Sequence, residues 1–217
     1  MDRPEIPVDI SAIEALARDF PELGDAVPAL IAAAASVVAS LDAGGTLFLT
    51  GNGGSFADCL HIAGELKKSF EKPRPLAPAL VEALTSLPAG QELAENLQAG
   101  LRAIVLGADP VLATAVDNDI DLRHIQFAQE LVALGRSGDV LMAISTSGNA
   151  KNVRNCALVA AALGMVVVVL TGEADSPLSE LGDVVIRAPA RATAQVQSWH
   201  SQLYHAFCRA VEDTLFA

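Results

Sequence analysis

The 217-residue sequence has few cysteines, few aromatic residues and little positive charge. Cys59, Cys156 and Cys208 are far apart and form no CxxC pair, so they indicate neither a disulfide framework nor a cysteine zinc site. A reducing cytoplasm is the expected location. The formal net charge of −12 argues against direct binding of nucleic acid, because neutralising phosphates needs clustered Lys and Arg.

The sequence also lacks a long hydrophobic run. Its longest weakly polar stretch, Ala26 to Leu41, is interrupted by Pro28 and Ser36, and no basic region precedes it at the terminus. This stretch is too short and too interrupted for a bilayer span and has the wrong flanks for a signal peptide. We therefore expect no membrane partner.

Apolar residues make up 52 % of the chain and aromatic residues only 4 %, which is typical of a parallel sheet covered by Ala-rich helices. From position 46 onwards, short apolar runs alternate with helical patterns, and this predicts an α/β fold with a doubly wound, five-stranded parallel sheet. The expected strands are 46–50, 103–106, 140–144, 166–170 and 184–186. The expected helices are 54–70, 122–134, 150–162 and 194–216.

Two regions stand outside this alternation. Residues 1–44 predict an N-terminal helical segment, followed by the main domain at 45–217. The second helix of the N-terminal segment, 25–41, is apolar almost all round, which fits either a subunit interface or a helix across the domain's own sheet. Between 71 and 101, four prolines and a helical pattern from Gly90 predict an inserted loop with one or two short helices, acting as a lid or a contact between molecules.

Two hydroxyl-rich turns carry the functional signal. Gly51-Asn52-Gly53-Gly54-Ser55 follows the first expected strand, and Ser145-Thr146-Ser147-Gly148-Asn149 follows the third. Glycines let backbone N–H groups approach a ligand, hydroxyls donate hydrogen bonds, and the next helix directs its positive dipole end at an anion. Neither turn is a Walker loop or a GxGxxG motif. The pair therefore predicts a sugar-phosphate pocket rather than a nucleotide site.

Two pairs of side chains are candidates for chemistry. His61 and Glu65 are four residues apart, so they share one helix face behind the first turn, and Gln197 and His205 lie eight apart on the last helix. Each pair also fits an ordinary surface or packing role, which is commoner for such residues.

Four sequence blocks favour the functional role over the ordinary one. They are the first turn with Asp58, His61 and Glu65; Asn118-Asp119; residues 138–149; and Val196-Gln197 with His200 and His205. In this combination the chain resembles the SIS (sugar isomerase) domain family, and within it the isomerases that act on sedoheptulose 7-phosphate. The blocks span about 46 to 210, nearly the whole main domain.

The resemblance implies an aldose–ketose isomerase that makes D-glycero-D-manno-heptose 7-phosphate through an enediolate, with Glu65 as base and His205 as acid. It implies one zinc ion per subunit on His61, Glu65, Gln197 and His205, in a cytoplasmic homotetramer. The substrate-binding residues that it implies are Asn52, Gly53, Gly54, Ser55, Asn118, Asp119, Ser145, Thr146, Ser147 and Gln197.

The chain departs from the family pattern at several pocket positions. Ala150 stands in place of a phosphate-binding Ser, and Ser69 in place of a substrate-contacting Arg; the other departures are Phe56, Gly64, Ala194 and Ser198. Two alternatives therefore stay open. One is an isomerase for a different sugar phosphate, and the other is a non-catalytic SIS regulator resembling the initiator-associating protein that binds DnaA.

Overall fold

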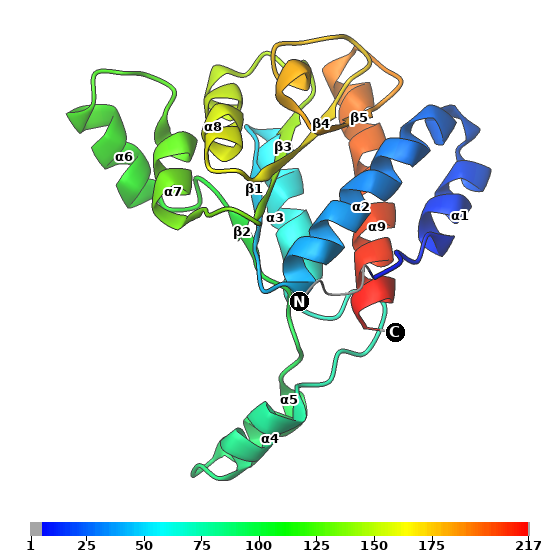
Figure 1. The fold of residues 1–217 in the computed structure, drawn as a ribbon, viewed down its shortest axis with the longest axis vertical. Coiled ribbons are helices and arrows are strands. Elements are labelled where there is room, and N and C mark those ends of the chain that lie inside the picture. The colour runs from blue at the N-terminus through cyan, green and yellow to red at the C-terminus, as the bar shows by residue number, and fades with distance from the viewer. Residues whose placement is uncertain (1–5, 217) are drawn as a thin grey trace.

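The computed structural model describes residues 6–216 and contains one five-stranded, all-parallel sheet in the order β2-β1-β3-β4-β5. Helices cover both of its faces (Figure 1). The predicted doubly wound α/β fold is confirmed, and each strand lies within one residue of its predicted limits. The strands are β1 Leu47–Thr50, β2 Ala103–Val105, β3 Val140–Ser145, β4 Val166–Thr171 and β5 Val184–Arg187.

Alternate residues of each strand enter two separate cores. Leu47 and Leu49 point to the face covered by α2, α3 and α9, whereas Phe48 points to the face covered by α7 and α8. The alternation follows from the two-residue period of a strand, and burial on both faces explains why these strands are apolar throughout.

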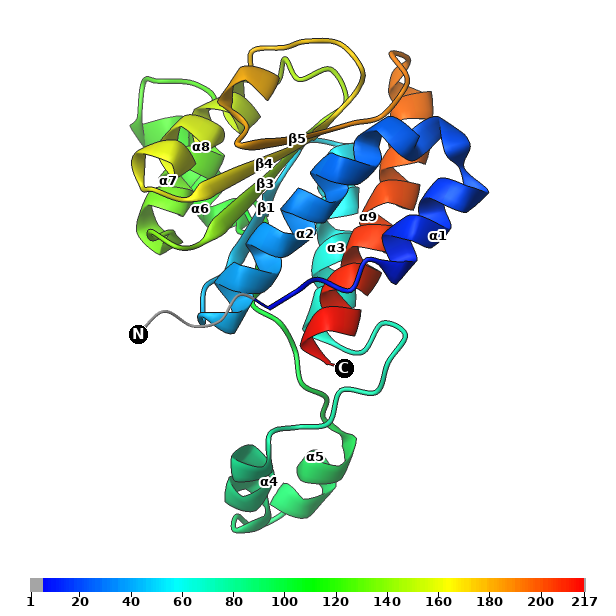
Figure 2. The same cartoon turned by 45° about the vertical axis from the view of Figure 1, so that its right-hand side comes forward.

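The helices follow the strands along the chain, with an N-terminal pair before them (Figures 1 and 2). In the described residues these helices are α1 Ser11–Asp19, α2 Val27–Asp42, α3 Gly54–Lys67, α4 Pro78–Thr85, α5 Gly90–Asn96, α6 Pro110–Asp119, α7 Gln126–Leu134, α8 Lys151–Ala162 and α9 Thr193–Leu215, with short 3-10 turns η1 Pro21–Ala26 and η2 Ser179–Leu181.

Helix α2 lies across the domain's own sheet, which is the second of the two roles expected for this apolar helix. Leu30, Val37 and Val38 enter the same core as β1 and α9. The stretch Pro21–Asp42 is long and apolar enough to meet a length-and-composition test for a membrane span. Since core helices meet the same test, this is weak evidence for a membrane.

The region from 107 to 126 differs from the prediction. Residues 110–119 form α6, which was not predicted, and α7 begins at Gln126 rather than 122. Asp109 caps α6 by accepting hydrogen bonds from the N–H groups of Val111 and Leu112, with Pro110 at the first helical position. His124 then takes a positive φ of 66°, which prevents the helix from continuing towards 122.

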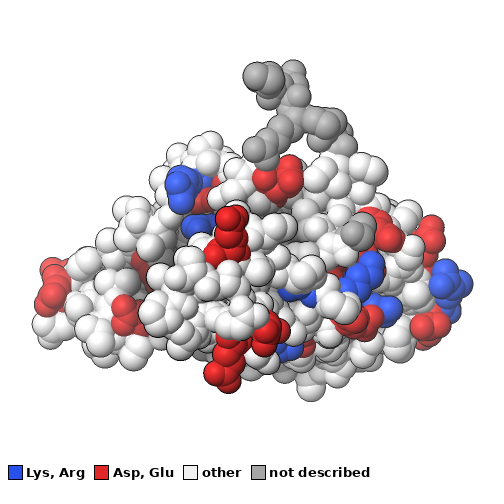
Figure 3. All heavy atoms as spheres, turned by 90° about the horizontal axis from the view of Figure 1, so that it is seen from below, with Lys and Arg blue, Asp and Glu red and all other residues white. Residues whose placement is uncertain are grey.

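The inserted segment forms an arm, α4 and α5, that projects from the domain (Figure 2). Its two helices pack on each other. Figure 3 views the molecule from below, and several acidic side chains lie on the face that it shows. The arm leaves the end of the domain opposite the two hydroxyl-rich turns (Figure 1), so it is not a lid over them within this chain. The predicted helix from Gly90 ends at Asn96 rather than Leu101.

Candidate active site

The two hydroxyl-rich turns meet at the point where the strand order reverses. Strands β1 and β3 are neighbours in the sheet, and the turn after each lies at its carboxyl end. In doubly wound sheets ligands bind at this switch point, because the loops there diverge to opposite faces and leave a crevice between them. The fold thus brings the two turns to one edge.

The first turn depends on glycine at two positions. Gly53 has φ +54° and ψ −119°, a conformation that disfavours any side chain, and a Cβ on Gly51 would lie 2.9 Å from the backbone of Ser55. Ser55 is buried in the first turn of α3. This geometry leaves the N-terminus of α3 accessible to an anion.

The second turn folds back on its own strand. The N–H of Gly148 donates to both the carbonyl and the hydroxyl of Ser145, at 3.2 Å each, and the N–H of Asn149 donates to the hydroxyl of Ser147 at 3.3 Å. Ser145 is buried, Thr146 is half-buried and Ser147 is exposed.

A pair of amides joins the first turn to the start of α8. The side chains of Asn52 and Asn152 exchange two hydrogen bonds of 2.8 Å, and the Asn152 oxygen also accepts the N–H of Val153 at 3.0 Å. Asn152 was not singled out in the sequence. Its contact with Asn52 depends on how a loop and a helix start 100 residues apart are placed, which no local spacing reveals.

A cluster of three side chains forms between α3 and α9. The Nε2 atom of His61 lies 3.1 Å from Oε1 of Glu65 and 3.4 Å from Nε2 of His205. One ligand atom from each residue can be chosen so that all three lie within 4.8 Å of one another. The His61 side chain is 46 % exposed and that of Glu65 is 17 % exposed, so the cluster is open to solvent within one chain.

Burial shifts two ionisable groups beside this cluster. It lowers the pKa of His205, an effect that neighbouring His61 reinforces and Glu65 opposes. It also raises the pKa of Asp58, whose Oδ2 atom is shielded from solvent and has no hydrogen-bond partner in the described residues. His205 is therefore largely neutral near pH 7, which is the form that binds a metal ion.

Two imidazoles and one carboxylate fit a catalytic zinc site. Such sites commonly use three protein ligands and leave a fourth position for water or substrate. The closeness of His61 Nε2 to both Glu65 and His205 provides the required donor set at one point.

Gln197 lies apart from this cluster. Its side-chain amide sits against Gly54, so closely that a Cβ on Gly54 would collide with it. Gly54 precedes His61 by seven residues, about 10 Å along the helix. Within one chain Gln197 therefore stands at the turn end of α3, where it suits a substrate contact better than a bond to the same ion.

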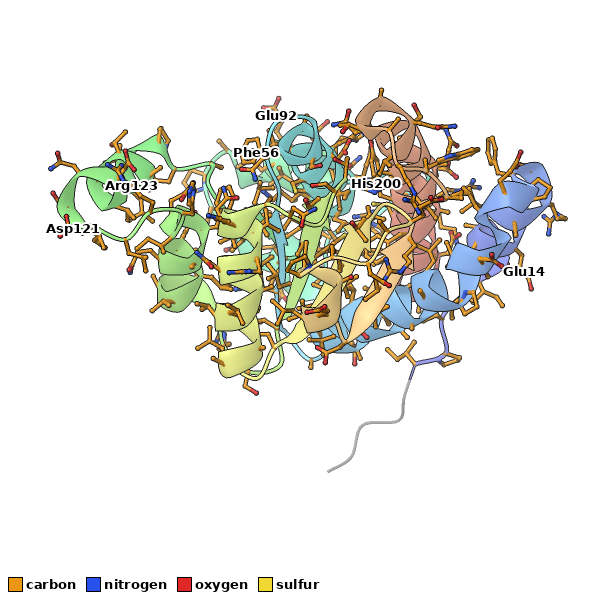
Figure 4. All side chains as sticks on the ribbon, turned by 90° about the horizontal axis from the view of Figure 1, so that it is seen from above. Glu14, Phe56, Glu92, Asp121, Arg123 and His200 are labelled. Carbon is orange, nitrogen blue, oxygen red and sulfur yellow. The ribbon has the colours of Figure 1, made fainter. Side chains whose placement is uncertain are left out.

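Asn118 and Asp119 also lie away from the three clustered side chains. They end α6, and the Asn118 amide donates to the Asp119 carboxylate at 2.8 Å on the exposed surface. Figure 4 looks onto the loop end of the sheet and shows the neighbouring Asp121 and Arg123 far from His200 on α9. The described contacts do not join this pair to either turn.

Tyr204 was not anticipated from the sequence. Its hydroxyl lies 3.0 Å from Nδ1 of His61, and its ring meets the His61 ring edge-on at a centroid distance of 5.4 Å. Its place next to His205 was the only available hint. The contact itself depends on the packing of α3 against α9.

Comparisons with known proteins identify the family. The SIS domain family model matches residues 121–211. The phosphoheptose isomerase of Rhodospirillum rubrum is 39 % identical over 196 residues, which are 90 % of this chain and 91 % of that protein. The enzyme of the same name from Thiobacillus denitrificans is 36 % identical over 210 residues, covering 95 % of this chain and 94 % of that protein.

Solved structures lead to the same group. A phosphoheptose isomerase from Neisseria gonorrhoeae superposes with a TM-score of 0.68 at 29 % identity, covering 94 % of this chain and all of that one. One from Francisella tularensis gives 0.70 at 27 % identity, covering 94 % and 95 % of the two chains. With its paired turns and its His-Glu-His cluster, this chain belongs to the SIS domain family, in the phosphoheptose isomerase branch.

Proposed function

We propose that this protein interconverts sedoheptulose 7-phosphate and D-glycero-D-manno-heptose 7-phosphate. The observation that carries the proposal is the meeting of His61, Glu65 and His205 further along the helix that starts at a phosphate-type turn, in a chain 39 % identical to a phosphoheptose isomerase. The substrate name comes from this relationship, and the site geometry is compatible with it.

The phosphate would bind at the two turns. Backbone N–H groups at the start of α3 and the hydroxyls of Ser55, Ser145, Thr146 and Ser147 supply donors, and the helix dipole favours an anion there. The Gln197 amide, held against Gly54, adds a polar group at the same place. These local donors would hold an anion in a chain whose net charge is −12.

The length of a heptose matches the spacing of the site. Gly54 and His61 are seven residues apart on α3, about 10 Å along its axis. A chain of seven carbons with bonds of about 1.5 Å, bearing a terminal phosphate, spans a similar distance. With its phosphate at the turns, such a sugar would present C1 and C2 to the clustered side chains.

The chemistry requires a base and a group that stabilises an oxyanion. Glu65 would collect the proton moved between C1 and C2, and His205 would deliver a hydrogen bond or proton to the oxygen that becomes charged. Because burial lowers the pKa of His205, its neutral ring would act through a ring N–H near pH 7. Asn118 and Asp119 would reach the sugar only if α6 moved.

One zinc ion per subunit would be held by His61, Glu65 and His205. When bound, it supplies a Lewis acid for the substrate oxygens. Gln197 would join this set only if its side chain left Gly54. The chain's own residues would orient the sugar and move the proton.

The exposure of the cluster favours an assembled enzyme. An enediolate needs protection from water, yet His61 is 46 % exposed in one chain. We therefore propose a homotetramer in which neighbouring subunits cover the site. All three cysteines are free and buried, which is compatible with the proposed cytoplasmic location.

Proton exchange tests the proposed reaction. The purified protein is incubated with sedoheptulose 7-phosphate in D₂O, with and without added zinc, and followed by NMR. We expect aldose signals and deuterium at C2 of the aldose, because the proton that Glu65 collects can exchange with D₂O before it is returned to the sugar. Binding without turnover or exchange under both conditions would instead favour the SIS regulator. Turnover of only another sugar phosphate would favour the altered-pocket alternative.

A further inference from the structure

Tyr204 is the single tyrosine of the chain, and its hydroxyl contacts the buried side of the His61 ring. The residue is only 4 % exposed and lies on α9, next to His205. His61 thus has two different sides. Its Nδ1 atom faces Tyr204, and its Nε2 atom faces Glu65 and His205.

The partners of His61 fix the direction of its hydrogen bonds when no metal is bound. An ionised carboxylate only accepts, so a neutral His61 ring must carry its proton on Nε2 to donate to Glu65. Nδ1 then has a lone pair and needs a donor. The Tyr204 hydroxyl, 3.0 Å away, is placed to be that donor.

Metal binding would reverse this pattern. A metal ion held by the cluster would take the lone pair of Nε2, so the ring proton would move to Nδ1, where a neighbour must accept it. A hydroxyl can donate or accept by rotating, whereas a carboxylate or an ammonium group offers only one of these roles. Tyr204 can therefore satisfy His61 in both states.

We infer that Tyr204 is a positioning residue whose hydroxyl holds the His61 ring in place and allows it to change tautomer when zinc binds. This inference rests on the proposed zinc site. Tyr204 does not touch the reacting atoms in this account. It acts through His61, in the way that second-shell partners orient metal-binding histidines.

The surroundings keep Tyr204 in its hydroxyl form. Burial raises the pKa of Tyr204 to about 12, and the nearby Asp58, Cys208 and Glu65 add to that rise. A tyrosinate could accept but not donate, so loss of the proton would remove one of the two roles. Near neutral pH both roles stay available.

The test compares wild type with Tyr204→Phe, which keeps the ring and removes only the hydroxyl. Ser201→Ala is the matched control, because it removes a hydroxyl one turn earlier on α9 whose one hydrogen bond within residues 6–216 goes to the carbonyl of Ser198. Zinc affinity is measured by competition with a chelator. The chain has four histidines, so ¹⁵N-histidine NMR can identify the tautomer of His61 directly.

In wild type we expect the Nε2–H tautomer without zinc and the Nδ1–H tautomer with zinc. Tyr204→Phe should weaken zinc binding by roughly 10- to 100-fold, the usual effect of losing such a partner, and saturating zinc should restore most turnover. Ser201→Ala should bind zinc like wild type.

Two results would overturn the inference. One is a zinc affinity of Tyr204→Phe within about twofold of wild type, and the other is an Nδ1–H tautomer in zinc-free wild type. If wild type binds no zinc, the tautomer change is refuted together with the metal site. The isomerase reaction is then judged separately, from turnover without metal.

Discussion

Arg74 and Glu212 form an ion pair that is closed off from solvent, with side chains 0 % and 1 % exposed and a Nε–Oε1 distance of 2.7 Å. The guanidinium also donates to the backbone carbonyls of Leu66 and Glu65, at 2.7 and 3.1 Å. The Glu212 carboxylate accepts the N–H groups of residues 70–72. This pair therefore fixes the end of α3, which carries Glu65, against α9.

Removing one partner of this pair should strongly destabilise the protein. Glu212→Ala leaves Arg74 charged and buried without its counter-ion, which typically costs about 3–5 kcal/mol. The free energy of unfolding in urea measures the loss. Arg123→Ala is the control, because Arg123 and Asp117 form an exposed pair, and such pairs contribute about 1 kcal/mol or less. Similar losses for the two variants would contradict this account.

The arm should be dispensable for folding of the domain. Apart from Gly90, no residue of segment 77–98 is buried. The two ends of its stem are held together at its base, where the N–H of Ala99 donates to the carbonyl of Arg74 at 2.8 Å. Replacing 77–97 by a short Gly-Ser turn should keep the urea unfolding free energy within about 1 kcal/mol. A loss of several kcal/mol would mean that the arm packs on the domain.

Local patterns predicted the elements that depend on local signals. Apolar runs located all five strands, and the four-residue spacing of His61 and Glu65 placed them on one helix face. The cap of α6 is also a local signal, since Asp109 and Pro110 are typical of a helix start, although no helix was predicted there.

Contacts between distant elements could not be read from spacing. Tyr204 meets His61 across 143 positions, and this depends on α3 and α9 packing side by side. Gln197 and His205 share α9, yet His205 reaches His61 whereas the Gln197 amide lies against Gly54, because eight residues advance the helix by about 12 Å. The inferred ligand set therefore needed three-dimensional placement.

Gly148 should be the more sensitive of two glycines with positive φ. Its φ is +66° and a Cβ would collide with the Ser176 hydroxyl, whereas Gly44, with φ +83°, has no atoms within 4 Å of that position. Gly44→Ala should cost only backbone strain, about 1–2 kcal/mol. Gly148→Ala should lose more stability and raise the KM for sugar phosphate. The two variants are compared by thermal unfolding and steady-state kinetics. Equal losses of stability would exclude a collision with Ser176.

His200 should make the protein less stable in acid. The ring is fully buried, and burial lowers its pKa to about 4 from 6.5, against a smaller opposing effect of the Thr171 backbone. The unfolded chain therefore binds a proton first as pH falls below 6.5. The stability that the neutral His200 contributes is complete above pH 6.5 and is lost as the pH falls towards 4.

His200→Leu tests that contribution, because Leu is similar in size and cannot be protonated. Urea unfolding at about pH 7 and about pH 4.5 gives the free energy of unfolding that each protein loses on acidification. The wild-type loss should exceed the variant's by an amount of the order of 2–3 kcal/mol, at 1.36 kcal/mol per pKa unit. If wild type and His200→Leu lost the same unfolding free energy between the two pH values, groups other than His200 would cause the acid sensitivity.

Glu65→Gln should remove the base without disturbing the pocket. Gln keeps the size of the side chain and an oxygen that can accept from His61, but it cannot collect the proton from the sugar. We expect kcat to fall by roughly 10²- to 10⁴-fold, the usual contribution of a positioned acid or base. The zinc-loaded variant and the zinc-loaded wild type are compared at equal metal content. A change in metal affinity then cannot be mistaken for the fall in kcat.

Binding separates this role from a structural one. The first phosphate turn ends at Gly54, eleven residues or about three turns of α3 before Glu65, so Glu65→Gln should bind sedoheptulose 7-phosphate within a few-fold of wild type by calorimetry. Ser147→Ala, at the exposed hydroxyl of the second turn, should show the opposite pattern. It should raise KM with little change in kcat, because a phosphate contact is equally strong in the ground state and the transition state. If Glu65→Gln retained full kcat, the proton would have to be moved by another group, and Asp58, with its raised pKa and unpartnered oxygen, would be the next residue to replace.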